Sequence, residues 1–419
     1  MRWYSTFDSF MGNACCLQAS DASCASRIGS IGGRALPPAH GGNSVSSICS
    51  GGPGVLITGG HDGSAAMWQW CVDGDAGDVV THRWSEHPGP VTRVAHLPLA
   101  GRVLTGCRDG VVRAWPSFDD DTPALTLCGH TLTVTGLDGL EELSAACSGS
   151  RDYTLRHWDL HTAKCVQMAA VSRNVVTSLR RCPGECTVVQ SSEDLKIRTW
   201  DVRDFSSGPC QTLEGHVNIP QCIDVSPCGR YILSCSNGFE GSGGSEVRFW
   251  DRRTGKVLQE WRDHDMSVNG CVFLPLPVIG NNDGRIGAAS GCSTFDETSL
   301  QGRHRFTTPK ADKCAGSGGC VNSLAPCVVV TASTDRTVRV FDYSYHRALH
   351  TRRFDGYGSS REAGPVLCCA ALEPPTVCAD NGKAYFAAGD LGGRTQVWVL
   401  NREDSMKTGN VRTFAHTTA

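Results

Sequence analysis

The chain has 419 residues, enough for two or three ordinary domains or for one large repeat architecture. Its 39 basic and 42 acidic residues are interspersed and give a formal net charge of -3, so no basic surface for nucleic acid or anionic lipid is expected. No apolar run approaches the roughly 18 residues that cross a bilayer, and no secretory signal opens the chain, so a reducing intracellular compartment is expected. The 23 cysteines should then be thiols, most of them small buried strand residues.

The first 39 residues predict a mostly disordered leader. It contains MGNACC, residues 11–16. If translation started at Met11, Gly12 would be available for myristate, with Cys15 and Cys16 beside it for palmitate, and two lipids make a stable membrane anchor. In the sequence as it stands Gly12 is internal, so the alternative is a disordered leader without lipid.

From residue 40 onwards the chain repeats. Four successive units end in a tryptophan that follows an aspartate by six residues, and these pairs are Asp62 and Trp68, Asp109 and Trp115, Asp152 and Trp158, and Asp194 and Trp200. The tryptophans recur at intervals of 42 to 47 residues, the length of one four-stranded propeller blade. Three further units end at Trp250, Phe341 and Trp398, so the repeat count is seven.

Each unit alternates apolar and polar residues in short strands around a polar turn. One such sheet cannot bury both of its faces alone, whereas seven sheets stacked radially can. The sequence therefore predicts an all-β, seven-bladed β-propeller over residues 40–419, with a flexible loop inserted in the sixth blade at about 280–320. Either residues 31–36 or the segment NVRTFAH near the C-terminus supplies the strand that closes the ring.

These units resemble the WD-repeat family, in which Gly-His stands near the start of a unit and Trp-Asp at its end. Gly129-His130 with Trp158-Asp159 carries the resemblance directly. The resemblance implies a buried hydrogen-bonded set of His, Ser or Thr, Asp and Trp in each blade. Three units supply all four residues: His40, Thr58, Asp62 and Trp68; His87, Thr105, Asp109 and Trp115; and His130, Ser148, Asp152 and Trp158. In the fourth unit Asp194 and Trp200 lack the histidine and the hydroxyl.

The stretch GSRDYTLRHWD, residues 149–159, holds the residue types of a hydrolase. In the implied set, however, the hydroxyl is buried and accepts from an indole, whereas a nucleophile must be exposed beside an oxyanion site. No phosphate-binding loop and no metal motif of paired cysteines or histidines stands elsewhere. We therefore expect no catalytic residue, no cofactor and no metal.

A propeller offers a rigid platform for several partners, so a monomeric protein-interaction scaffold within larger complexes is the leading hypothesis. The residues just before the turn aspartates should project at one rim, and these are His61, Arg108, Arg151, Glu193 and Thr334. Arg108 and Arg151 fall on adjacent blades and are the candidate site for an acidic partner. The alternative is that they are solvated rim charges.

Four stretches, at 127–137, 171–179, 190–201 and 233–241, resemble a cilia-linked branch of the WD-repeat family. That resemblance implies an adaptor in ciliary or flagellar assembly and membrane traffic, located in the cytoplasm at a cilium or its base. The alternative function is a substrate receptor of a cullin ubiquitin ligase. Some WD-repeat proteins dock on such ligases through Trp-Asp-x-Arg, and Arg203 and Arg253 complete that pattern here.

Overall fold

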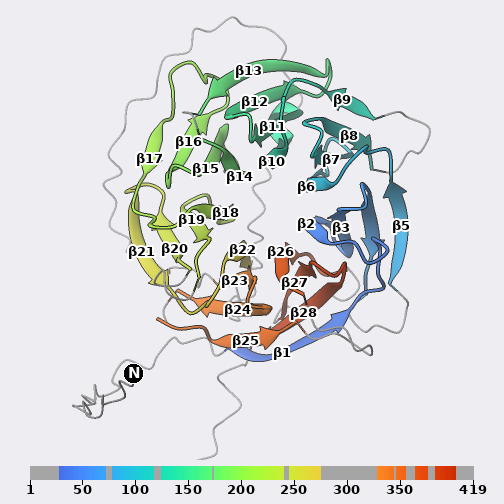
Figure 1. Cartoon of the computed structure of the whole chain (residues 1–419), viewed down its shortest axis with the longest axis vertical. Helices are drawn as coiled ribbons and strands as arrows, with labels where there is room; N and C mark the ends of the chain where they lie inside the picture. The colour runs from blue at the N-terminus through green and yellow to red at the C-terminus, as the bar shows by residue number, and fades with distance from the viewer. Residues whose placement is uncertain are drawn as a thin grey trace, which may run out of the picture.

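The computed structural model describes residues 28–71, 78–117, 124–171, 174–239, 245–274, 328–343, 346–354, 364–375 and 383–402. Within these residues, seven four-stranded sheets lie around a common axis, so the protein is a seven-bladed β-propeller, as the repeat pattern predicts (Figure 1). The inserted loop predicted at about 280–320 lies outside the described residues, as do the segment before residue 28 and NVRTFAH.

Every blade is an antiparallel meander whose first strand lies nearest the axis and whose fourth strand lies at the rim (Figure 1). Blade 1 contains β2 (Val45–Gly52), β3 (Val55–Gly60), β4 (Ala65–Gln69) and β5 (Val79–Trp84). Blade 2 contains β6 (Val91–Leu97), β7 (Arg102–Cys107), β8 (Val112–Pro116) and β9 (Leu125–Leu127). Blade 3 contains β10 (Val134–Leu140), the 3-10 turn η1 (Glu141–Leu143), β11 (Ala145–Ser150), β12 (Thr154–Asp159) and β13 (Lys164–Ala170).

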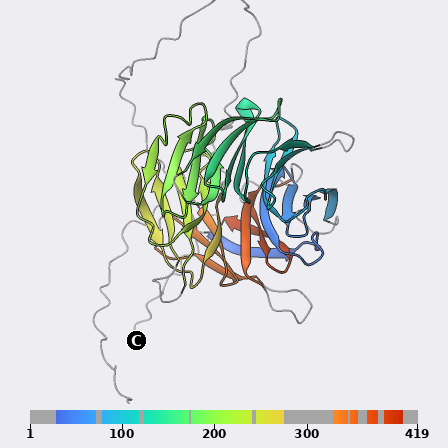
Figure 2. The same cartoon turned by 45° about the horizontal axis from the view of Figure 1, so that its top comes forward.

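The remaining blades repeat the same order, and Figure 2 shows them standing side by side around the ring. Blade 4 contains β14 (Val176–Arg181), β15 (Thr187–Ser192), β16 (Ile197–Asp201) and β17 (Gln211–Leu213). Blade 5 contains β18 (Pro220–Val225), β19 (Tyr231–Ser236), β20 (Val247–Asp251) and β21 (Lys256–Trp261). Blade 6 contains β22 (Val268–Leu274), β23 (Val328–Ser333), β24 (Thr337–Asp342) and β25 (His350–Arg353). Blade 7 contains β26 (Val366–Leu372), β27 (Lys383–Asp390), β28 (Thr395–Arg402) and β1 (Ile28–Ala35).

The burial of each strand follows its place in the blade. The second strand is covered on both faces by neighbouring blades, so β11 is buried at every residue and β7 at all but its first. The rim strand β13 has water on one face and alternates between exposed and partly buried residues over most of its length. The hydrophobic core is therefore a ring of clusters between adjacent blades, and one of them joins Leu97 of blade 2 to Leu137 and Trp158 of blade 3.

The N-terminal strand β1 completes blade 7. It pairs antiparallel with β28, and the register places Gly33 opposite Trp398. Ile31 lies in the cluster that also contains Trp398 and Phe386. The folded ring therefore includes residues well before residue 40, where the sequence pattern of the repeats begins.

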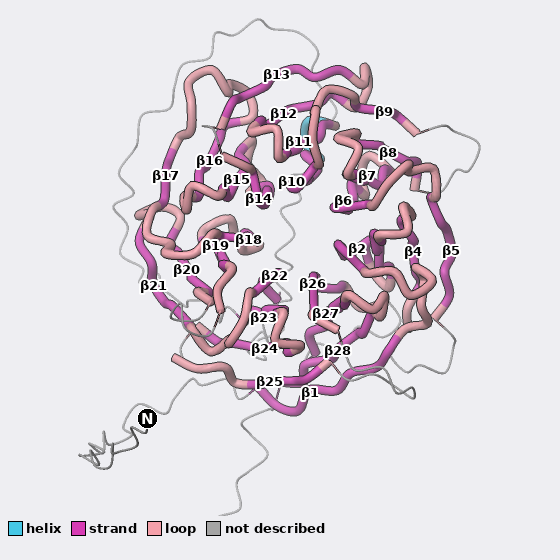
Figure 3. Tube along the Cα trace, viewed as in Figure 1, coloured by secondary structure: helices cyan, strands magenta, loops and turns pink. Residues whose placement is uncertain are grey.

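Figure 3 shows the loops, in pink, that connect the strands of each blade. Because successive strands are antiparallel, these connections alternate between the two faces of the ring. We call one of them the turn face: it carries the turns from the second to the third strand of each blade and the segments that link one blade to the next. The opposite face carries the other two kinds of connection. In the part of the chain that the structure describes, no helix has the length and apolar character needed to cross a membrane.

Candidate functional site

The turn between the second and third strands is built around an aspartate. In blade 3, Asp152 Oδ1 accepts the backbone N–H of Thr154 at 3.0 Å and the Thr154 hydroxyl at 2.7 Å. Such a local bond fixes a tight turn, and Tyr153 within it has φ of +70°. Blade 1 builds the same turn from Asp62 and Ser64, with a backbone bond of 3.0 Å.

A chain of hydrogen bonds, which we call the blade network, runs from the tryptophan to this aspartate. In blade 3, Trp158 Nε1 donates to Ser148 Oγ at 2.8 Å, and that hydroxyl lies 2.7 Å from His130 Nε2. His130 Nδ1 lies 2.9 Å from Asp152 Oδ2. Because an indole only donates, the hydroxyl donates to Nε2 and the Nδ1 hydrogen goes to the carboxylate.

Blade 1 contains the same network. The bonds measure 3.1 Å from Trp68 to Thr58, 2.9 Å from Thr58 to His40 and 3.0 Å from His40 to Asp62. Burial lowers the pKa of His40. Burial opposes ionisation of Asp62, but hydrogen bonds from Ser64 and the nearby His40 outweigh it and lower the carboxyl pKa. At neutral pH the network therefore joins a neutral imidazole to a carboxylate.

Blade 2 departs from the expected set. Trp115 donates to Thr105 at 2.8 Å, but His87 bonds to neither Thr105 nor Asp109 in the described structure. Arg113 intervenes, with Nη1 3.2 Å from His87 Nδ1 and Nη2 3.0 Å from Asp109 Oδ2. Burial, with the Arg113 charge adding to it, lowers the pKa of His87 to about 4.

Blade 2 lacks the bond between histidine and aspartate because of the residue two positions after the turn aspartate. Ser64 and Thr154 stand there in blades 1 and 3, and each hydroxyl contacts both the carboxylate and the histidine Nδ1. Blade 2 has Val111 at that position, which offers no hydroxyl. Asp109 turns to Arg113 instead, so the prediction of a complete network in blade 2 is wrong.

Blade 5 completes the network with a glutamate that sequence reasoning missed. His216 Nε2 lies 2.8 Å from Ser234 Oγ, which accepts from Trp250 at 2.8 Å. His216 Nδ1 lies 2.8 Å from Glu246 Oε2, and the Glu246 side chain is fully buried. Glu246 precedes its tryptophan by four residues, as Ser64 and Thr154 do, and its longer side chain reaches the histidine without a turn aspartate. An acid at that position was the signal available in the sequence.

Within the described residues, the remaining blades contain only parts of the blade network. In blade 6, His264 joins Thr331 and Asp335, each at 2.7 Å, although about seventy residues of chain separate them. Blade 4 has no such histidine: Trp200 donates to Gln190 at 3.3 Å and Asp194 pairs with Arg198. In blade 7 the buried Trp398 Nε1 has no partner among the described residues.

The blade networks stabilise the fold and expose no nucleophile. The Ser148 side chain is fully buried and its oxygen is occupied by the Trp158 indole. A hydroxyl that attacks a substrate must be open to that substrate. The set Ser148, His130 and Asp152 therefore binds neighbouring strands to one another.

The rim residues predicted from the sequence occupy equivalent places on the turn face. Each donates its backbone N–H to the carbonyl of the segment that precedes its blade, at 2.8–3.0 Å, and the donors are His61, Arg108, Arg151, Glu193 and Thr334. The first four are exposed and Thr334 is partly exposed. The shared bond holds them in one conformation around the rim.

Arg108 and Arg151 lie on either side of Thr133. Thr133 Oγ1 donates to the Arg108 carbonyl at 3.4 Å, and the Thr133 carbonyl accepts the Arg151 N–H at 3.0 Å. Neither guanidinium makes an ion pair with another residue that the structure describes. Leu132 and Tyr153 beside them are 51% and 42% exposed. We call these four residues the blade 2–3 patch.

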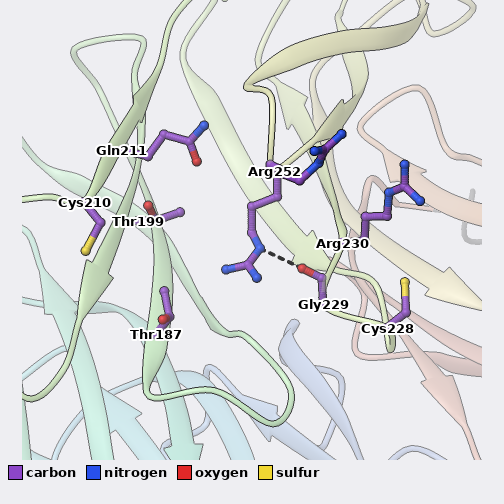
Figure 4. A pocket seen from close by; sticks show the side chains of 9 residues that line it. Thr187, Thr199, Cys210, Gln211, Cys228, Gly229, Arg230 and Arg252 are labelled. Carbon is purple, nitrogen blue, oxygen red and sulfur yellow. Dashed lines mark hydrogen bonds between the residues drawn. The ribbon is translucent and has the colours of Figure 1, made fainter. Parts of the chain in front are cut away.

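The opposite face has an open pocket between blades 4 and 5 (Figure 4). It is lined by Thr187, Thr199, Cys210, Gln211, Cys228, Gly229, Arg230, Arg252 and Arg253. Arg252 does not move freely there, because Nε donates to the Gly229 carbonyl at 2.7 Å and the two Nη atoms lie 2.9 and 2.5 Å from Glu185.

The two arginines of the Trp-Asp-x-Arg pattern differ. Arg203 is held by Asp201 through bonds of 2.9 Å from Nε and 2.6 Å from Nη2. Arg253 lines the pocket, and its guanidinium makes no ion pair within the described structure. Of the other predicted sites, Gly12, Cys15 and Cys16 lie outside the described residues.

Comparison with known proteins finds a family model that matches three of the seven repeats. Residues 79–116, 121–159 and 207–251 match the family model described as WD domain, G-beta repeat. The chain is 24% identical to nuclear distribution protein nudF of Emericella nidulans over 341 residues, covering 62% of this chain and 76% of that protein. It is 31% identical to WD repeat-containing protein 81 of Danio rerio over 189 residues, covering 41% of this chain and 9% of that protein.

Among solved structures, the WD40 β-propeller domain of Doa1 is similar with a TM-score of 0.60 at 18% identity. The match covers 89% of this chain and 96% of that one, which supports the fold. Each matched sequence repeat contains the rim strand of one blade and three strands of the next, as residues 79–116 contain β5 to β8. The repeats are therefore offset from the blades by one strand and interlock the ring.

Proposed function

Because three stretches of the chain match the WD domain, G-beta repeat model and the chain folds into a seven-bladed propeller, we propose that it is a non-catalytic scaffold that binds other proteins. Propellers built from WD repeats typically act in that way. The observation that carries the proposal is the blade 2–3 patch, where Arg108 and Arg151 are presented together beside two exposed apolar side chains. Arginine and aromatic residues are enriched at protein interfaces.

The patch is suited to an acidic segment that also carries an apolar side chain. The two guanidinium groups supply charge and forked donors for carboxylates. Leu132 and Tyr153 supply the apolar contact that exposed ion pairs alone lack. Since both arginines are anchored through their backbone to Thr133, little conformational entropy of the main chain is lost on binding.

Charge reversal tests the patch. The double variant Arg108→Glu/Arg151→Glu is expected to weaken binding of the patch's partner about tenfold or more, because attraction becomes repulsion at two adjacent points. The measurement is affinity purification of the tagged protein from its own cells, with partners quantified by mass spectrometry.

The matched control is Arg230→Glu/Arg347→Glu, which reverses two exposed arginines on the opposite face. If the rim variant keeps every partner at the level of the unmodified protein, the patch is only a solvated surface. Loss of the same partners in both variants would also contradict the proposal, because a general effect of charge would then explain the result.

A second candidate function is a substrate receptor of a cullin ubiquitin ligase, and the position of Arg253 favours it. Arg253 lines the pocket of the opposite face, whereas Arg203 is bound by its own neighbour Asp201. If the ligase adaptor copurifies and Arg253→Glu removes it while Arg203→Glu does not, this function replaces plain scaffolding. Absence of the adaptor from the purified complexes would rule it out.

We further propose that the protein works in cilia or flagella. The support is the resemblance of four stretches, among them residues 127–137 and 190–201, to the cilia-linked branch of the family. If the leader is acylated, Gly12→Ala in the tagged endogenous protein is expected to move signal from ciliary membrane to cytosol. Mass spectrometry of the native N-terminus provides the second measurement. Diffuse signal in both forms would contradict the ciliary and the lipid proposals together.

A further inference from the structure

Three cysteine thiols converge between blades 5 and 6. Cys222 lies on β18, Cys235 on β19 and Cys271 on β22. Their sulfur atoms all lie within 4.8 Å of one another. Among the described residues, these three form a cluster of side chains close enough together to hold one metal ion. Sequence analysis predicts no metal site, because the three residues are far apart in the chain and form no paired motif.

The strand register brings the thiols together. Cys222 and Cys235 are opposite residues of neighbouring strands. The thiols of Cys235 and Cys271 both point at the carbonyl oxygen of Cys222, each at 3.6 Å. Cys235 and Cys271 are fully buried, whereas Cys222 is partly exposed.

The other blades provide an internal comparison for these three positions. Pairing places Ser47 opposite Gly59 in blade 1 as it places Cys222 opposite Cys235, and Val94 of blade 2 corresponds to Cys271. A Cβ added at Gly59 would lie 2.7 Å from Val91 Cγ1 and 2.9 Å from Val94 Cγ1, so these branched neighbours favour glycine there. In blade 6 the valine equivalent to Val91 is kept as Val268, but the smaller Cys271 replaces the equivalent of Val94 and relieves that contact beside Cys235 of blade 5. Packing therefore explains Cys235 and Cys271, but it gives no reason for a cysteine at position 222.

Positive charge lies near the group. Arg180, on the inner strand of blade 4, interacts electrostatically with Cys222 and Cys271, and Arg93 of blade 2 interacts with Cys222. A thiolate rather than a thiol is the form that binds metals.

We propose that Cys222, Cys235 and Cys271 bind one thiophilic cation, Cu⁺, through three sulfur ligands. Soft thiolate ligands select Cu⁺, Zn²⁺ or iron–sulfur clusters. Structural Zn²⁺ sites take four protein ligands, and no fourth Cys, His, Asp or Glu of the described residues joins this group. Binding replaces the thiol protons, which leave to solvent, and the excess negative charge of the complex faces Arg93 and Arg180. The bound ion would join blade 5 to blade 6.

The test uses the full chain, reduced and kept free of oxygen, titrated with Cu⁺ in competition with the Cu⁺ chelator bicinchoninate. The variant Cys222→Ser/Cys235→Gly/Cys271→Val copies the residues of blades 1 and 2 at these positions, so its packing has a precedent in the same molecule. The unmodified protein is expected to retain one more equivalent of Cu⁺ than this variant. Its melting temperature should also rise with that equivalent, and the variant's should not.

The control variant changes three exposed thiols, Cys128→Ser/Cys210→Ser/Cys228→Ser, and is expected to retain the same tight equivalent as the unmodified protein. X-ray absorption of the unmodified protein with one equivalent of Cu⁺ should show three sulfur ligands, and this measurement does not depend on how the variants fold. Equal retention by the blade-1-like variant, fewer than three sulfur ligands, or a site that takes Zn²⁺ and not Cu⁺ would each overturn the proposal.

Discussion

Glu246→Ala is expected to lower the free energy of unfolding by about 3–5 kcal/mol, the typical cost of removing one partner from a buried ionic group. The carboxylate is fully buried and accepts from four donors. His216 Nδ1 lies at 2.8 Å, the Val217 N–H at 3.1 Å, and Arg248 and Arg262 at 3.4 and 3.1 Å. Alanine would leave His216 Nδ1 without its acceptor, while Arg248 and Arg262 would keep their contacts with Glu260. Denaturant unfolding followed by tryptophan fluorescence measures the loss.

Two comparisons separate charge from hydrogen bonding at Glu246. Glu246→Gln keeps an acceptor oxygen and should lose less stability than alanine. Asp152→Ala removes the corresponding acid of blade 3, where no arginine forms an ion pair with it in the described structure, and should cost about 1–3 kcal/mol. A loss below about 1 kcal/mol for Glu246→Ala would show that the buried network contributes little.

The pH dependence of this loss has a definite sign. Burial opposes ionisation of Glu246, but the bond from His216 and the charge of Arg248 outweigh it, so the carboxyl pKa lies below its ordinary value of 4.5. A lowered carboxyl pKa contributes stability that is complete above the unfolded value and is lost as the pH falls through the folded value. The difference between the unmodified protein and Glu246→Gln should therefore shrink below about pH 4.5.

Gly33→Val is expected to detach β1 from blade 7 and to cost about 3 kcal/mol, at the upper end of the cost of overpacking. A Cβ at Gly33 would lie 2.4 Å from Cε3 of Trp398, on the strand that β1 pairs with. Any side chain there collides with the indole, so the strand that closes the ring must move. Hydrogen exchange should show lost protection of the amides of β1 and β28.

A size exchange is the control for Gly33→Val. Trp398→Ala removes the atoms that Gly33→Val would strike, and the Trp398 indole N–H has no partner in the described structure to lose. The double variant should recover protection of β1 relative to Gly33→Val alone, because the two sites are in contact and their effects are not additive. Protection of β1 unchanged by Gly33→Val would contradict closure by the N-terminal strand.

The sequence alone predicts the blade count, because the aspartate and the tryptophan recur at a fixed spacing in four successive units and in part in the other three. Asp152 is bonded to Thr154 two residues away, and Trp158 reaches Ser148 on the adjacent strand of the same hairpin. Because these contacts are local, their residues recur at a fixed spacing in the sequence. An exposed rim residue such as Arg151, which precedes the turn aspartate, recurs at the same spacing.

Contacts between strands that are distant in the chain produce no regular spacing in the sequence. Glu246 bonds to His216 from a different position in its repeat. Its longer side chain takes the place of the missing turn aspartate. Arg113 bonds to His87 in place of the expected aspartate. This outcome depends on where the flexible arginine side chain lies in the folded blade. Periodicity cannot decide either case.

Ring closure and the thiol group depend on the tertiary structure most of all. The amino-acid order determined that seven hairpin-built units would stack, since each must bury its two faces. Only the closed ring decided that β1 pairs with β28, more than three hundred residues away, and that cysteines of β18, β19 and β22 share one space. Both depend on which blades become neighbours, and that is set by closing the whole circle rather than by any local run of residues.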